Sequence, residues 1–166
     1  MIGTTSSISG TVQVKAGGDT ITTQTTGSVG ATNATAIGFK NNAGTYSGAI
    51  YVNGSSTTYN TSSDYRLKEN VVDITDGITR VKQLQPKRFN FIVDADTTVD
   101  GFLAHEAQTV VPEAVTGTHN EVDGDGNAVM QGIDQSKLVP LLTAALQEAI
   151  AKIETLQAKV AALEAQ

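Results

Sequence analysis

The stretch LTAALQEAIAKIETLQAKVAAL, residues 142–163, decides the C-terminal part of the fold. Its apolar residues recur at alternating spacings of four and three: Leu142, Leu146, Ala149, Ile153, Leu156, Val160 and Leu163. Such spacings place the residues on one side of a helix and form a heptad seam. The pattern therefore predicts a long helix within residues 133–166, with Asp134 or Ser136 as its N-cap, that associates with other copies of the chain.

The number of helices in this coiled coil stays open. β-Branched Ile153 and Val160 alternate with Leu, a combination that favours two helices, whereas Ile150 widens the apolar stripe and favours a higher order. An amphipathic helix lying on its own domain is the alternative. The regularity of the seam over three heptads favours self-association.

Residues upstream of this helix predict a small α+β domain. A helix is expected over 73–86, DITDGITRVKQLQP, with Ile74, Ile78, Val81 and Leu84 on one face and an end at Pro86. A strand is expected over 87–93, with Phe89, Phe91 and Val93 on one side. The next segment, 101–115, predicts a strand start, a short helix and a break at Pro112, and 120–129 predicts a hairpin turn.

Residues 1–62 differ sharply in composition, since they carry three charges (Lys15, Asp19, Lys40) of the 28 in the chain. Ser and Thr supply 22 of these residues and Gly 10, so the segment cannot bury a core alone. It is either a disordered linker or a set of strands that other copies stabilise. Strand patterns at Ile8, Val12 and Val14, and at Ala49–Val52 before Asn53-Gly54, favour a β-rich, intertwined fibre stem.

Charge and composition exclude several classes of protein. The chain has 11 Lys+Arg against 17 Asp+Glu, a net charge of −6, which disfavours binding to nucleic acid. No Cys and only two His are present, so we expect no metal site and no cofactor, and no apolar run predicts membrane insertion. Asp123, Asp125, Asn127 and Asp134 resemble a calcium loop, but Ala128 stands where Gly is required and a hairpin turn explains the same residues.

The segment SSDYRLKENV, residues 62–71, combines a hydroxyl nucleophile with cations. It lies where the charge-poor residues 1–62 meet the charged remainder of the chain. A Ser needs a base, and Lys68 could serve Ser63. Five residues turn a helix by about 500°, which leaves the two side chains about 140° apart, and on a strand they point to opposite faces. The pair therefore needs a bend between its members or contact between chains. Spacing alone favours a solvated linker.

Four blocks in this order give a more specific signal: SSDYRLKENV, LQPKRFNF, GFLAHEAQTVVPEAV and DQSKLVPLLTAALQE. Together they resemble the C-terminal intramolecular chaperone domain of phage tail fibres, tail spikes and endosialidases, a family of self-cleaving peptidases that also occurs in a cellular myelin regulatory factor. The resemblance covers residues 62–166. It implies an α+β domain, residues 63–166, that trimerises a virion tail fibre or spike, directs folding of the stem and then releases itself.

The resemblance also implies roles for four residues. Ser63 matches the nucleophile and Lys68 the general base, while Asp64 and Arg66 match supporting positions that orient the turn or the lysine, hold a carboxylate or support the oxyanion. Cleavage is expected beside Ser63, either before or after it and within or between chains. His105 departs from the family pattern and is given no catalytic part.

Two rival interpretations remain. In the first, the domain only trimerises and never cleaves. In the second, residues 1–62 form the receptor-binding tip, with Tyr46, Tyr51 and Tyr59 contacting a host glycan.

Overall fold

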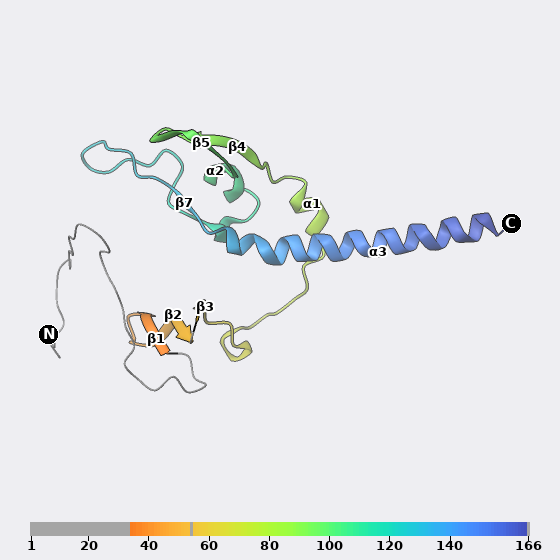
Figure 1. The fold of residues 1–166 in the computed structure, drawn as a ribbon, viewed down its shortest axis with the longest axis horizontal. Coiled ribbons are helices and arrows are strands. Elements are labelled where there is room, and N and C mark those ends of the chain that lie inside the picture. Colours follow the sequence, from red (N-terminus) through yellow and green to blue (C-terminus); the bar gives the residue numbers. More distant parts are fainter. Residues whose placement is uncertain (1–33, 54, 166) are drawn as a thin grey trace. The chain divides into compact units, whose positions relative to one another are not determined.

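The computed structural model describes residues 34–53 and 55–165. The chain divides into two compact units, Met1–Val71 and Val72–Gln166. Figure 1 shows the helices and strands of both units. The predicted strands around Ile8, Val12 and Val14 lie outside the described residues. The division predicted at residue 62 stays a prediction.

The described part of the first unit is an antiparallel sheet of three strands in the order β1-β2-β3. The strands are β1 (Ala34–Lys40), β2 (Tyr46–Asn53) and β3 (Ser56–Thr61). The predicted strand over Ala49–Val52 is confirmed, and β2 pairs with β3 from Asn53↔Ser56 to Gly48↔Thr61. Among the described residues of this sheet only Ala49 is buried, at 3% exposure. The sheet therefore has almost no core of its own.

The turn between β1 and β2 shows how polar residues shape this sheet. The Asn41 side chain accepts hydrogen bonds from the backbone N–H groups of Ala43 and Thr45, each at 3.0 Å. Gly44 has φ +77°, a conformation that favours glycine. This short loop reverses the chain because Asn and Gly supply the bonding and the backbone freedom that it needs.

The second unit is α+β with two small antiparallel sheets, as expected for the domain. Its strands are β4 (Lys87–Phe91), β5 (Asp94–Gly101), β6 (Val115–Thr116) and β7 (Gly132–Ile133). Its helices are α1 (Gly77–Val81), α2 (Ala104–Gln108) and α3 (Val139–Glu164), with 3₁₀ turns η2 (Pro112–Ala114) and η3 (Gln135–Leu138). The core joins α2, η2, β6 and the start of α3 through Ala107, Val110, Val111, Ala114, Val115, Leu138 and Leu141.

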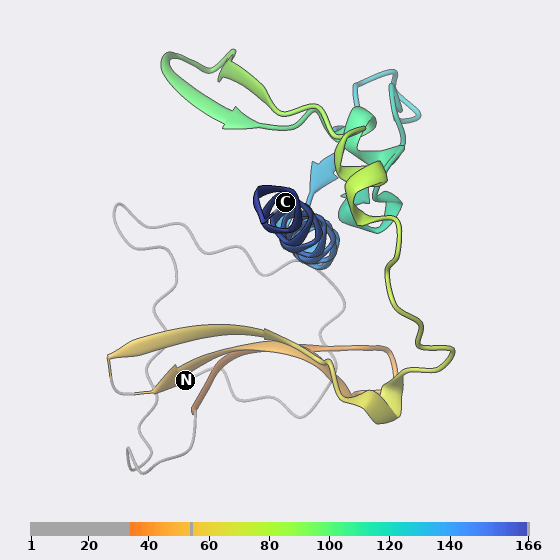
Figure 2. The same cartoon turned by 90° about the vertical axis from the view of Figure 1, so that its right-hand side faces the viewer.

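Two expectations for this unit are wrong in their bounds. The helix expected over 73–86 is only the five-residue α1, Gly77–Val81. Its start is held by a distant group, since the Glu148 carboxylate on α3 accepts hydrogen bonds from the backbone N–H groups of Gly77 and Ile78. The strand expected over 87–93 ends at Phe91. Val93 lies in the turn to β5 and is 96% exposed. Figure 2 shows this β4–β5 hairpin projecting from the rest of the unit.

Helix α3 confirms the predicted long C-terminal helix, and its 26 residues span about 39 Å. Asp134 is the cap of η3, which leads into α3, and its side chain accepts from the Ser136 backbone N–H at 3.0 Å. The face of α3 that packs on its own unit consists of Leu141, Ala144 and Ala145. The heptad seam lies on a different face, where Leu142, Leu146, Ile153, Leu156, Val160 and Leu163 are all exposed. A coiled coil stays a prediction for this seam.

No helix among the described residues has the length and apolar character needed to cross a membrane.

Candidate functional site

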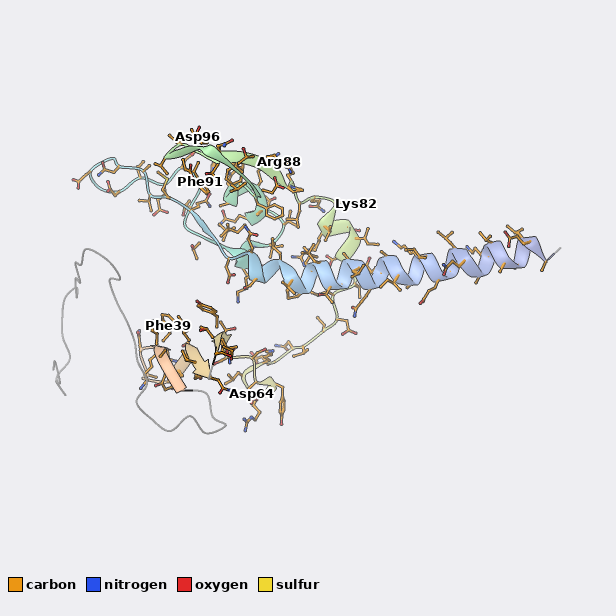
Figure 3. All side chains as sticks on the ribbon, viewed as in Figure 1. Phe39, Asp64, Lys82, Arg88, Phe91 and Asp96 are labelled. Atoms are coloured by element: carbon orange, nitrogen blue, oxygen red, sulfur yellow. The ribbon has the colours of Figure 1, made fainter. Side chains whose placement is uncertain are left out.

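The candidate site begins where β3 ends. After Thr61 the chain enters a 3₁₀ turn, η1 (Tyr65–Leu67), that carries no buried residue. Asp64 caps this turn, since its side chain accepts from the backbone N–H of Arg66 at 2.9 Å. The Lys68 N–H closes the turn on the Tyr65 carbonyl at 3.0 Å. Figure 3 labels Asp64 at this turn.

The turn supplies the bend that the spacing of Ser63 and Lys68 requires. Lys68 Nζ donates a hydrogen bond to Ser63 Oγ at 2.8 Å. Both residues belong to the same chain, so contact between chains is not needed to bring them together. A nucleophile and a base within such a distance have the geometry for proton transfer.

Asp64 and Arg66 form a bidentate pair beside these two residues. Arg66 Nε donates to Asp64 Oδ1 at 2.9 Å and Arg66 Nη2 to Asp64 Oδ2 at 2.8 Å. The Arg66 side chain, more than any other group, lowers the pKa of Asp64, and Asp64 in turn raises the pKa of Arg66. Asp64 thus caps the turn and Arg66 holds the Asp64 carboxylate, while the roles expected for the two residues in cleavage stay predictions.

The structure ties Ser62, the residue before the nucleophile, to β2. Its backbone N–H donates to the Ser47 carbonyl at 3.2 Å, and its hydroxyl donates to the Tyr46 carbonyl at 3.4 Å. These bonds extend the β2–β3 ladder by one residue, up to the nucleophile. No motif reveals this contact, because it depends on strand register across 16 residues.

Solvent reaches the site in a single chain. Ser63 and Lys68 are exposed, and the apolar side chains of Tyr65 and Leu67 beside them are 81% and 72% exposed. The described residues therefore bring nucleophile and base into contact at a position that is open to solvent.

The remaining candidates lie in the second unit. The ring of His105 stacks on that of His119 with centroids 4.2 Å apart. The Asp123 carboxylate accepts from the backbone N–H groups of Asp125 and Asn127, each at 2.9 Å, and hydrogen bonds from Asn127 are the largest cause of its lowered pKa. Val122 and Ala128 form a single bridge across this turn, so the segment that resembles a calcium loop is a hairpin turn. Within the described residues, no group of three or more His, Cys, Asp or Glu is arranged to hold a metal ion.

Comparison with known families identifies the segment that contains the Ser–Lys pair. Residues 63–116 match the family described as the chaperone of endosialidase. The match confirms the resemblance found in the sequence blocks. It begins at Ser63 and includes Lys68, the β4–β5 hairpin and α2. The name of this chaperone-of-endosialidase family also classes it as a peptidase family. No curated protein matches the chain.

Proposed function

We propose that this chain trimerises part of a phage tail fibre or spike, directs folding of its β-rich stem and then cleaves itself beside Ser63. The observation that carries the peptidase part is the 2.8 Å hydrogen bond between Lys68 Nζ and Ser63 Oγ, within a segment that matches the chaperone of endosialidase. The Ser–Lys pair acts once, on its own chain.

The chemistry follows from where the nucleophile lies. Ser63 Oγ attacks the carbonyl carbon of Ser62 and passes its proton to the unprotonated amine of Lys68. The bond between the Ser62 carbonyl carbon and the Ser63 nitrogen breaks, and that nitrogen takes up the proton from Lys68. An ester links the two parts until water hydrolyses it. The attack closes a five-membered ring within one chain, which favours it over attack by another chain.

The turn keeps the reacting groups together. Asp64 caps η1 and is itself held by Arg66 at 2.8 to 2.9 Å, so the backbone between Ser63 and Lys68 stays bent. A bent backbone keeps the amine within reach of the hydroxyl and reduces the entropy lost on the way to the transition state.

Two features support assembly with other copies. The seam of α3 exposes six large apolar residues on a face that its own unit does not cover. The sheet of the first unit exposes Ile37, Phe39 and Tyr59 and buries only Ala49 among its described residues. Neighbouring chains would cover both surfaces, and a trimer aligns three stems before their strands pair. Release of the chaperone then leaves a stem whose stability is kinetic.

The alternative is a trimerisation module that does not cleave. The exposure of Ser63 and Lys68 favours it, because neither side chain lies in a closed site that excludes water.

Incubation of the purified chain, followed by denaturing electrophoresis and size measurement of the native protein, tests the proposal. Wild-type protein should give two fragments, and Lys68→Met should stay intact with the same oligomeric size. Lys82→Met, which removes a lysine from the end of α1, should cleave like wild type. An intact chain in all three proteins would support the non-cleaving module, and a monomer would contradict the trimer.

A further inference from the structure

We propose that the β2–β3 hairpin positions the bond to be cut, with Ser62 as the positioning residue. This inference rests on the proposed self-cleavage and adds a residue that holds the attacked carbonyl in place. It concerns a residue outside the segment that matches the family, which begins at Ser63.

The carbonyl to be attacked belongs to a residue that is held on both sides. On one side, the N–H of Ser62 bonds to the Ser47 carbonyl at 3.2 Å and its hydroxyl to the Tyr46 carbonyl at 3.4 Å. On the other side, the Ser63 hydroxyl bonds to Lys68 at 2.8 Å. The Ser62 carbonyl therefore belongs to a peptide group that is held on one side by β2, through Ser62, and on the other by Lys68, through Ser63.

Attack on a carbonyl requires a narrow range of approach angles, and small misplacements lower the rate strongly. When the hairpin is open, the backbone at Ser62 rotates freely and the Ser63–Lys68 pair faces no fixed carbonyl. When β3 is fully paired, both hydrogen bonds form and limit that rotation. Pairing of β3 with β2 thus holds the Ser62 carbonyl in place for attack by Ser63.

A substitution at Gly48 should disturb the hydrogen bonds between Ser62 and β2 without changing Ser62 itself. Gly48 pairs with Thr61, the last residue of β3, and a Cβ added at Gly48 would lie 2.7 Å from the Asn60 carbonyl oxygen. Because backbone atoms move aside only at a high energetic cost, Gly48→Ala should separate β2 from β3 next to Ser62. The change touches neither Ser63 nor Lys68.

The test compares single-turnover cleavage rates of the full chain. Ser62→Ala removes one hydrogen bond, worth about 1 kcal/mol, so cleavage should slow about fivefold. Ser62→Thr keeps the hydroxyl and should restore the rate to within about twofold of wild type. Ser56→Ala is the matched control, because it removes the same type of bond, to the Asn53 carbonyl at 3.0 Å, at the opposite end of the hairpin. It should cleave like wild type.

Two further readouts separate positioning from general damage. The pH dependence of the Ser62→Ala rate should keep the shape of the wild-type profile, because Lys68 is unchanged. Gly48→Ala should slow cleavage more than Ser62→Ala does, whereas Gly124→Ala, whose added Cβ meets nothing within 4 Å, should not. Equal slowing by Ser56→Ala and Ser62→Ala, or wild-type rates in both Ser62→Ala and Gly48→Ala, would overturn the inference while self-cleavage stands. Wild-type protein that never cleaves would overturn both proposals.

Discussion

Lys68 Nζ lies 2.8 Å from Ser63 Oγ although five residues separate them, because a capped 3₁₀ turn folds the chain back between them. Neither a helix nor a regular strand brings two side chains together at this spacing. The contact therefore depends on the turn as much as on the two residues that meet.

The first prediction concerns pH. Cleavage needs the unprotonated amine of Lys68, so its rate should rise as the pH rises. The pKa of Asp64 is lowered in the folded chain, chiefly by Arg66. Its contribution to the turn is therefore complete above its unfolded value of about 3.8 and is lost only as the pH falls through the lower folded value. Quench-flow or gel kinetics should show a single rising limb, and a flat profile would contradict Lys68 as the base.

The second prediction concerns the turn. Asp64→Ala removes the cap of η1 and both bonds from the Arg66 side chain, so it should slow cleavage about tenfold without abolishing it. Asp100→Ala is the matched control, since Asp100 also forms an exposed bidentate pair, with Arg88 at 2.7 and 2.9 Å, on the β4–β5 hairpin. It should leave the cleavage rate unchanged. Similar slowing by both variants would argue against a specific role for the turn.

The third prediction concerns the packing of α1 on α3. A Cβ added to Gly77 would lie 2.5 Å from the Ala145 backbone nitrogen, so Gly77→Ala should push the two helices apart. We expect a loss of about 2 kcal/mol in the free energy of unfolding, or more, measured by denaturant titration in a Ser63→Ala background that keeps the chain intact. Gly124→Ala should change it by less than about 0.5 kcal/mol. Equal stability of both variants would show that α1 does not pack closely on α3.

The fourth prediction concerns assembly. Leu156→Asp places a charge in the seam, where Leu156 is 59% exposed and makes no core of its own unit. Analytical ultracentrifugation should show a trimer for the parent and a shift toward monomer for this variant, with unchanged helix content. Ala158→Asp puts the same charge on the same helix outside the seam and should remain a trimer. A trimer in both variants would place the contacts between copies elsewhere.

Much of the fold follows from local pattern, and the exceptions have physical causes. The seam of α3, the strand Ala49–Val52 and the hairpin near Asp123 depend on residues close in sequence, so spacing and turn chemistry predict them. The helix expected over 73–86 begins only at Gly77, whose backbone N–H is bound by Glu148, a residue 71 positions away. Such long-range hydrogen bonds leave no trace in local periodicity.

The candidate site, too, is only partly predictable from the sequence. The blocks around Ser63 and Lys68 indicate the family, whereas spacing alone favoured a solvated linker because the turn between the two residues could not be seen. Sequence rules can predict Asp64 as a cap, but they do not predict its bidentate pair with Arg66. The role of Ser62 depends on the register of β3 against β2, which a sequence poor in large apolar residues specifies weakly.

Intact-mass spectrometry of the wild-type chain beside Ser63→Ala tests whether Ser63 cleaves its own chain. We expect two wild-type fragments whose masses sum to the 17.3 kDa chain plus one water, with the first ending at Ser62, and a single uncut chain in Ser63→Ala. A wild-type chain that stays whole, or a Ser63→Ala chain cut at the same bond, would contradict self-cleavage by Ser63.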